Sequence, residues 1–136
     1  MYVMFEGRFK NFAVVEEYVN NLQKALGINR LRRPLTIIFK SNLDGMYGLC
    51  DGDEDSAEIE IATKGLTFMR QMTTLAHEMV HARQFIRGEL KSQGAWKWKG
   101  RNADNYAYTN QPWEKEAYRL ERELFLDCFP FDKEIS

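Results

Sequence analysis

Histidine is scarce in this chain, and the features that mark membrane proteins and nucleic-acid-binding proteins are missing. There are two histidines and two cysteines among 136 residues, and the net charge is −1. A balanced charge gives no general electrostatic attraction to nucleic acid or to an anionic membrane. No apolar run has the length of a membrane span, and residues 1–6 lack the basic and apolar regions of a secretory signal. These absences favour a cytoplasmic protein that binds no membrane.

The two cysteines, Cys50 and Cys128, are isolated in the sequence and form no CxxC pair. We expect two free thiols in a reducing compartment, and neither is spaced like a zinc ligand relative to the histidines. The length and the ordinary hydrophobic content of 44% predict one domain over residues 1–136.

The hydrophobic pattern predicts an α+β fold with a small, mostly antiparallel sheet of three or four strands. Apolar residues at helical spacing predict helices over 11–27, 66–88 and 112–127. Runs rich in β-branched and aromatic residues predict strands over 35–39, 45–50 and 57–62. Residues 1–10 fit either a short strand or a loose arm. The acidic loop 51–56 lacks the glycine and glutamate of a calcium-binding EF-hand loop, which favours a solvated hairpin turn.

Aromatic and basic residues alternate in the segment 96–101, Trp-Lys-Trp-Lys-Gly-Arg. Such interleaving can bind single-stranded nucleic acid through stacking and phosphate contacts. The same period of two suits a hairpin that packs its tryptophans inward and exposes its lysines. The near-neutral net charge favours the hairpin.

The residues that carry chemistry are His77-Glu78-Met79-Val80-His81, and this HExxH motif contains both histidines of the chain. On a helix, positions 77 and 81 lie one turn apart on the same face. Two imidazoles at this spacing can share one zinc ion, and Glu78 is a candidate general base beside them.

A catalytic zinc site needs three protein ligands and one open position. Because both histidines are already used, the third ligand has to be a carboxylate or a cysteine. The later helix offers Glu114 and Glu116, which diverge by about 200° on a helix and cannot both face one metal. Their positions relative to the apolar stripe of that helix do not choose between them.

HEMVH followed by E-x-E-A in a later helix resembles the gluzincin metallopeptidases, and most of all the ImmA/IrrE-type family. The strand residues Ile59-Glu60-Ile61 and the segment 74–76 before the motif are also similar to that family, so the resemblance covers roughly residues 57–128. It implies a minimal zincin-like fold, one Zn²⁺ per chain and a peptide or protein substrate. It also implies that Glu116, directly before Ala117, is the third ligand.

Two features depart from that family: the segment between motif and later helix is longer, and no helix-turn-helix domain is evident. SprT-like proteases resemble the HEMVH helix as well, but they use a third histidine that this chain lacks.

The expected activity is hydrolysis of a peptide bond by a zinc-activated water, with Glu78 as general base. We expect the strand 57–62, with Ile59, Glu60 and Ile61 at its centre, to be the edge on which an extended substrate pairs. Since no histidine is left to stabilise an oxyanion, the candidate donors are Tyr106, Tyr108 and Tyr118. The alternative is a non-enzymatic module that binds protein or nucleic acid and whose metal site is structural or vestigial.

Overall fold

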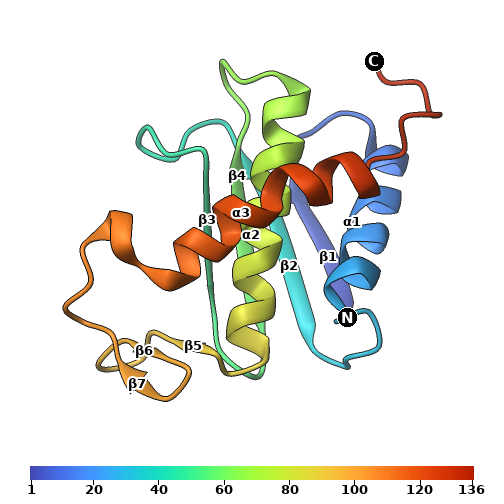
Figure 1. Cartoon of the computed structure of the whole chain (residues 1–136). Coiled ribbons are helices and arrows are strands. Elements are labelled where there is room, and N and C mark those ends of the chain that lie inside the picture. Colours follow the sequence, from blue (N-terminus) through green and yellow to red (C-terminus); the bar gives the residue numbers. More distant parts are fainter.

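The computed structural model describes residues 1–136, and a four-stranded sheet in the order β1-β2-β4-β3 supports its three helices (Figure 1). The strands are β1 (Tyr2–Gly7), β2 (Pro34–Lys40), β3 (Gly48–Gly52) and β4 (Ala57–Ala62). β1, β2 and β4 are parallel, whereas β3 is antiparallel to β4. The fold is therefore α+β with a mixed, mostly parallel sheet.

The prediction of a mostly antiparallel sheet was wrong, because β1 pairs parallel with β2 and because β4 lies between β2 and β3 and pairs parallel with β2. Residues 2–7 form a strand, and helix α1 (Phe12–Leu26) returns the chain so that β2 starts at the same end of the sheet as β1. A helical connection of this length is what parallel neighbours need. Gly27 ends α1 in the left-handed conformation, with φ 71°.

Strand β4 alternates as predicted, but it is not an edge of the sheet. Ile59 and Ile61 are buried in the core, whereas Glu58 is exposed on the opposite face. Because β2 pairs with one side of β4 and β3 with the other, β4 has no free edge for a substrate. The edge strands are β1 and β3.

Helix α2 (Phe68–Ile86) packs against the sheet, and helix α3 (Pro112–Cys128) crosses over α2 (Figure 1). Thr67 caps α2 by accepting a hydrogen bond from the Arg70 amide at 3.1 Å. Leu75, Met79 and Val80 are fully buried beneath α3 and above the sheet. Each helix begins and ends within two residues of its predicted position. None of the helices has the length and apolar character needed to cross a membrane.

The segment 96–101 is a hairpin, as the alternation predicted. It belongs to a small antiparallel sheet of β5 (Leu90–Lys91), β6 (Lys97–Trp98) and β7 (Arg101–Asn102), followed by the short helix η1 (Tyr108–Asn110). Lys99 and Gly100 both have positive φ, which is the two-residue turn that such hairpins favour. Trp96 stacks on Trp113 of α3, with ring centroids 5.6 Å apart.

The acidic loop 51–56 is also the hairpin turn that was predicted. Asp53 accepts hydrogen bonds from the Asp55 and Ser56 amides, and β3 and β4 pair antiparallel on either side of the loop. Cys50 and Cys128 are free cysteines.

The contact between α1 and α2 contains a buried hydrogen bond that can be tested. The Tyr18 hydroxyl donates to the Met72 carbonyl oxygen at 2.8 Å. Tyr18→Phe should lower the free energy of unfolding by about 1 kcal/mol, as measured by urea denaturation. The control is Tyr2→Phe, because Tyr2 is 60% exposed and its loss should leave the midpoint unchanged. Equal effects of the two substitutions would contradict this account.

Candidate metal centre

Helix α2 places both histidines of the motif on the face that lies beneath α3. His77 and His81 are buried, and the His77 and His81 Nε2 atoms lie 3.0 Å and 3.1 Å from Glu114 Oε1. The ligand atoms of the three side chains all lie within 4.8 Å of one another. A cluster of two imidazoles and one carboxylate is therefore a candidate metal site.

Glu114 reaches this position because it lies in the first turn of α3, where that helix begins against α2. Pro112 occupies the start of the helix. Proline suits this position because it has no amide hydrogen and a first-turn amide has no partner within the helix. Trp113 is buried on the side of the small sheet and anchors the same turn. The carboxylate of Glu114 is thus held over the histidines by a packed helix terminus.

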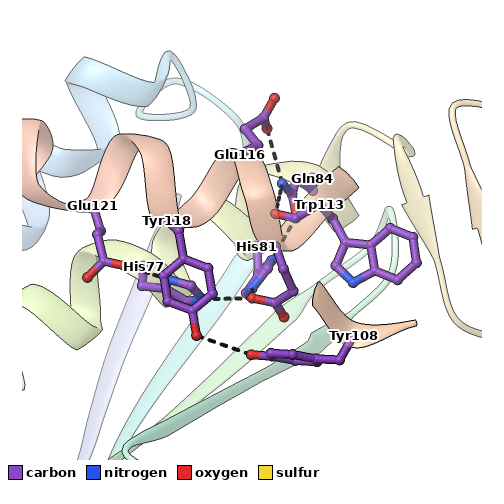
Figure 2. A network of polar contacts seen from close by, with 9 residues as sticks. His77, His81, Gln84, Tyr108, Trp113, Glu116, Tyr118 and Glu121 are labelled. Carbon is purple, nitrogen blue, oxygen red and sulfur yellow. Dashed lines mark hydrogen bonds and ion pairs between the residues drawn. The ribbon is translucent and has the colours of Figure 1, made fainter. Parts of the chain in front are cut away.

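The outer ring nitrogens of the histidines also have partners (Figure 2). His81 Nδ1 lies 2.8 Å from Gln84 Oε1, and His77 Nδ1 lies 3.2 Å from Glu121 Oε1. Donation of the Nδ1 proton to such oxygens leaves the Nε2 lone pair for a metal, which is the usual arrangement around ligating histidines.

The chemistry of these donors fits a divalent cation. With Nδ1 protonated, each neutral imidazole presents an Nε2 lone pair to the negatively charged oxygen of Glu114, so acceptors face acceptors. Only a cation between them, either protons or a metal ion, removes the conflict. Nitrogen and carboxylate oxygen are ligands that zinc accepts, and His₂Glu is a known set of zinc ligands.

The charges of the site shift the pKa of each ligand. Burial alone would lower the pKa of His77 and His81, but the hydrogen bonds to Glu114 and the neighbouring carboxylates outweigh it and raise both. Burial would raise the pKa of Glu114, but hydrogen bonds from the two histidines lower it to about 2. Glu114 is therefore a carboxylate at any pH near neutrality.

Glu78 lies beside the three ligands and is also buried. Burial raises its pKa to about 7, although the two histidines oppose this shift. Its side chain lies close to Gly48 of β3, where an added Cβ would come within 3.1 Å of Glu78 Oε2 and 2.7 Å of Thr74 Cγ2. A glycine at this point of the strand therefore leaves room for the Glu78 carboxylate.

The choice of Glu116 as third ligand was wrong. Its Oε1 accepts hydrogen bonds from Arg83 at 3.3 Å and from Gln84 at 3.1 Å, and Figure 2 shows its carboxylate pointing away from the histidines. Glu116 faces Arg83 and Gln84 near the C-terminal end of α2. The opposite side of the first turn of α3, which carries Glu114, lies over the histidines of the motif. Glu114 occupies the place that the resemblance assigned to Glu116.

The three candidate tyrosines divide into two groups. Tyr108 and Tyr118 line the same cleft as the ligands, and their hydroxyl oxygens lie 3.2 Å apart. The Tyr118 ring also packs against the His77 ring, with centroids 4.6 Å apart. Tyr106 packs edge-on against Trp113 instead and is not among the residues that line the cleft.

The cleft has a volume of about 510 Å³. Its walls come from residues 45–50, from the face of α2 that carries the motif, and from η1 and α3. Strand β3 therefore forms one wall, and the ligand cluster with Glu78 forms the floor. A substrate in the cleft would meet a sheet edge on one side and the ligands below.

Sequence reasoning missed Gln84 and Glu121, the partners of the outer nitrogens. Gln84 follows His81 by three residues, so it lies on the same face of the helix, and this spacing is a signal that could have found it. Glu121 follows Glu114 by seven residues, but Glu123 follows Glu116 by seven as well. Periodicity therefore gives no signal that favours Glu121.

Comparisons of the chain with protein-family models, with curated proteins and with solved structures find no match. The geometry itself supports a coarser statement. His77, His81 and Glu114 fit an HExxH helix completed by a glutamate from a later helix.

The assignment of the third ligand can be tested with matched substitutions two residues apart. Glu114→Gln removes the anionic ligand, so zinc affinity should fall by more than the about 10- to 100-fold typical of an outer partner. Glu116→Gln keeps an oxygen acceptor for Arg83 and Gln84 and should retain one zinc per chain. Elemental analysis measures the zinc content of each variant, and competition with a chromophoric chelator measures its zinc affinity. Equal losses in the two variants would contradict the assignment.

Proposed function

We propose that this chain is a zinc-dependent peptidase that hydrolyses peptide bonds. The observation that carries the proposal is the buried cluster of His77, His81 and Glu114 with Glu78 beside it, at the floor of a cleft next to a strand edge. A structural zinc site is usually closed by four protein ligands. Here three converge, which leaves a position for substrate or water.

A zinc ion bound by His77, His81 and Glu114 would supply Lewis-acid polarisation of the scissile carbonyl and activation of a water molecule. Glu121 and Gln84 hold the two rings by their Nδ1 atoms, so the Nε2 atoms stay aimed at the ligand position. The protein thus orients the ligands before any metal arrives.

Glu78 serves as the general base. Its carboxylate takes a proton from the attacking water and passes it to the leaving nitrogen as the peptide bond breaks. Burial raises the pKa of the Glu78 carboxyl, which makes its carboxylate a stronger proton acceptor beside the ligand position. A purely structural metal site has no need of this residue.

An extended substrate would pair with β3 and not with β4. The Tyr47 carbonyl oxygen accepts from the Ala62 amide at 2.9 Å, so residue 47 bonds toward β4. In an antiparallel pair the direction alternates, and the backbone groups of Gly48 and Cys50 therefore point to the free edge. Gly48 and Cys50 both line the cleft, where those groups can pair with a substrate backbone.

Tyr108 and Tyr118 are the candidate donors for the oxyanion. The hydrogen bond to Tyr118 and partial burial raise the pKa of Tyr108, so its hydroxyl stays protonated at neutral pH. One of the two hydroxyls donates to the other, so the accepting tyrosine keeps its own O–H free to donate to a negatively charged carbonyl oxygen.

Glu78→Gln tests the proposed chemistry. The amide keeps the size of the side chain but cannot take a proton, so peptide cleavage should fall by about 10²- to 10⁴-fold. Cleavage is measured with a denatured protein or a peptide library as substrate. Zinc content and the circular dichroism spectrum should match those of the unchanged protein.

Unchanged function in Glu78→Gln would instead favour the non-enzymatic binding module. That such a module binds nucleic acid stays a prediction. Salt-dependent retention of the protein on single-stranded DNA would test it.

Metal removal gives a second test, independent of a substrate. Zinc present at about 1,000 times its dissociation constant should raise the free energy of unfolding by about 4 kcal/mol relative to the metal-free protein. Thermal or urea unfolding with and without a chelator measures this difference. In the Glu114→Gln variant, zinc should raise the free energy of unfolding by a much smaller amount. A stability that does not respond to zinc would argue against the site.

A further inference from the structure

Gln84 is a buried polar residue whose contacts extend beyond the His81 ring that it holds. It lies three residues after His81 on α2 and is 0% exposed. A buried amide is costly unless its hydrogen-bonding groups are satisfied. Here the side-chain oxygen and nitrogen of Gln84 both have partners, and the partners lie on two different helices.

The direction of the Gln84 amide is determined by these partners. Nε2 lies 3.1 Å from the Trp113 carbonyl oxygen and 3.1 Å from Glu116 Oε1, and both of these are acceptors. The nitrogen must therefore point to α3, which leaves the amide oxygen for His81. Because Oε1 is an acceptor, the His81 Nδ1 atom at 2.8 Å has to be the donor.

The second bond of Gln84 acts on the third ligand. The Trp113 carbonyl belongs to the peptide bond that joins Trp113 to Glu114, so its bond to Gln84 holds the backbone directly before the Glu114 side chain. The bond to Glu116 holds the same turn at a second point. The Gln84 side chain thus contacts the ring of one ligand, His81, and the carbonyl of the residue directly before another ligand, Glu114.

The hairpin holds the opposite side of the same turn. Trp113 is buried with Phe85, Leu90 and Ala103, and the Trp96 ring stacks on it at an interplanar angle of 10°. The centroid of the Trp98 ring lies 6.1 Å from the centroid of the Trp113 ring. The aromatic residues of the segment 96–101 therefore support Trp113 from outside, while Gln84 holds its carbonyl from inside.

We propose that Gln84 is a positioning residue that sets the ring of His81 and the first turn of α3 together, so that His81 and Glu114 are aligned before a metal binds. The proposal rests on the metal site of the proposed function, but not on any cleavage by it. Loss of the amide should leave the fold in place and separate the two ligands.

The test compares Gln84→Met with Gln23→Met in the full chain. Gln23 is the matched control, because it is also a buried, hydrogen-bonded glutamine but lies on α1, away from the site. Gln84→Met should weaken zinc binding by about 10- to 100-fold and change the visible spectrum of the cobalt-loaded protein. Gln23→Met should lower the urea midpoint and leave both metal readouts unchanged.

Hydrogen exchange of the metal-free protein gives a second measurement beside the zinc affinity. Hydrogen exchange of the amides of residues 113–117 should become faster in Gln84→Met and stay unchanged in Gln23→Met. Wild-type zinc affinity, cobalt spectrum and exchange in a folded Gln84→Met protein would overturn the proposal. If the wild-type protein binds zinc but cleaves no peptide, the peptidase proposal fails while the affinity difference still supports the role of Gln84.

A pair of substitutions tests the link between the helices by rescue. Gln84→Glu keeps an acceptor for His81 but faces the Glu116 carboxylate without a donor, so zinc affinity should fall. Adding Glu116→Gln returns an amide donor to that contact and should recover part of the lost affinity. No recovery in the double variant would contradict the link through Glu116.

Discussion

One carboxylate oxygen, Oε1 of Glu114, lies about equally close to the Nε2 atoms of His77 and His81, at 3.0 Å and 3.1 Å. The crossing of α3 over α2 brings it there, and the site depends on that crossing. Contact between two buried imidazoles and a half-buried carboxylate is unfavourable unless the charges are balanced. The arrangement is therefore understandable as a cation site in which the protein supplies the negative charge and the oriented lone pairs.

The rest of the fold supports that crossing from two sides. α2 packs on β3 and β4, and Ile59 and Ile61 of β4 are fully buried in the core, which fixes the height of the motif above the strands. The small sheet then holds the start of α3 through the stack of Trp96 on Trp113. An alternation of aromatic and basic residues that also suits nucleic-acid binding thus has a structural use next to the ligands.

The cleft combines a strand edge with an acidic floor. β3 is free on one side because β4 pairs only with its other side, and Gly48 lets the strand approach Glu78 closely. Gly48 pairs with Ile61 of β4, so it lies on the same face of the sheet as the buried residues that pack against α2.

Several features could be predicted from the sequence because they depend on neighbours within one element. Helical spacing placed His77, Glu78 and His81 on one helix, the shortage of histidine excluded a third imidazole, and period two identified the buried face of β4. Parallel pairing was not predictable, because the first strand was ambiguous and the direction of β2 depends on how α1 crosses the sheet.

The sequence by itself determined that two imidazoles lie one helical turn apart with Glu78 beside them, and that a third donor would have to be a carboxylate or a cysteine. Only the tertiary structure decided which carboxylate it is. Glu114 and Glu116 stand on opposite sides of one helical turn, and each is followed seven residues later by another glutamate, so no pattern within α3 separates them. The separation comes from the direction in which α3 crosses α2, since that direction turns Glu114 toward the histidines and Glu116 toward Arg83 and Gln84.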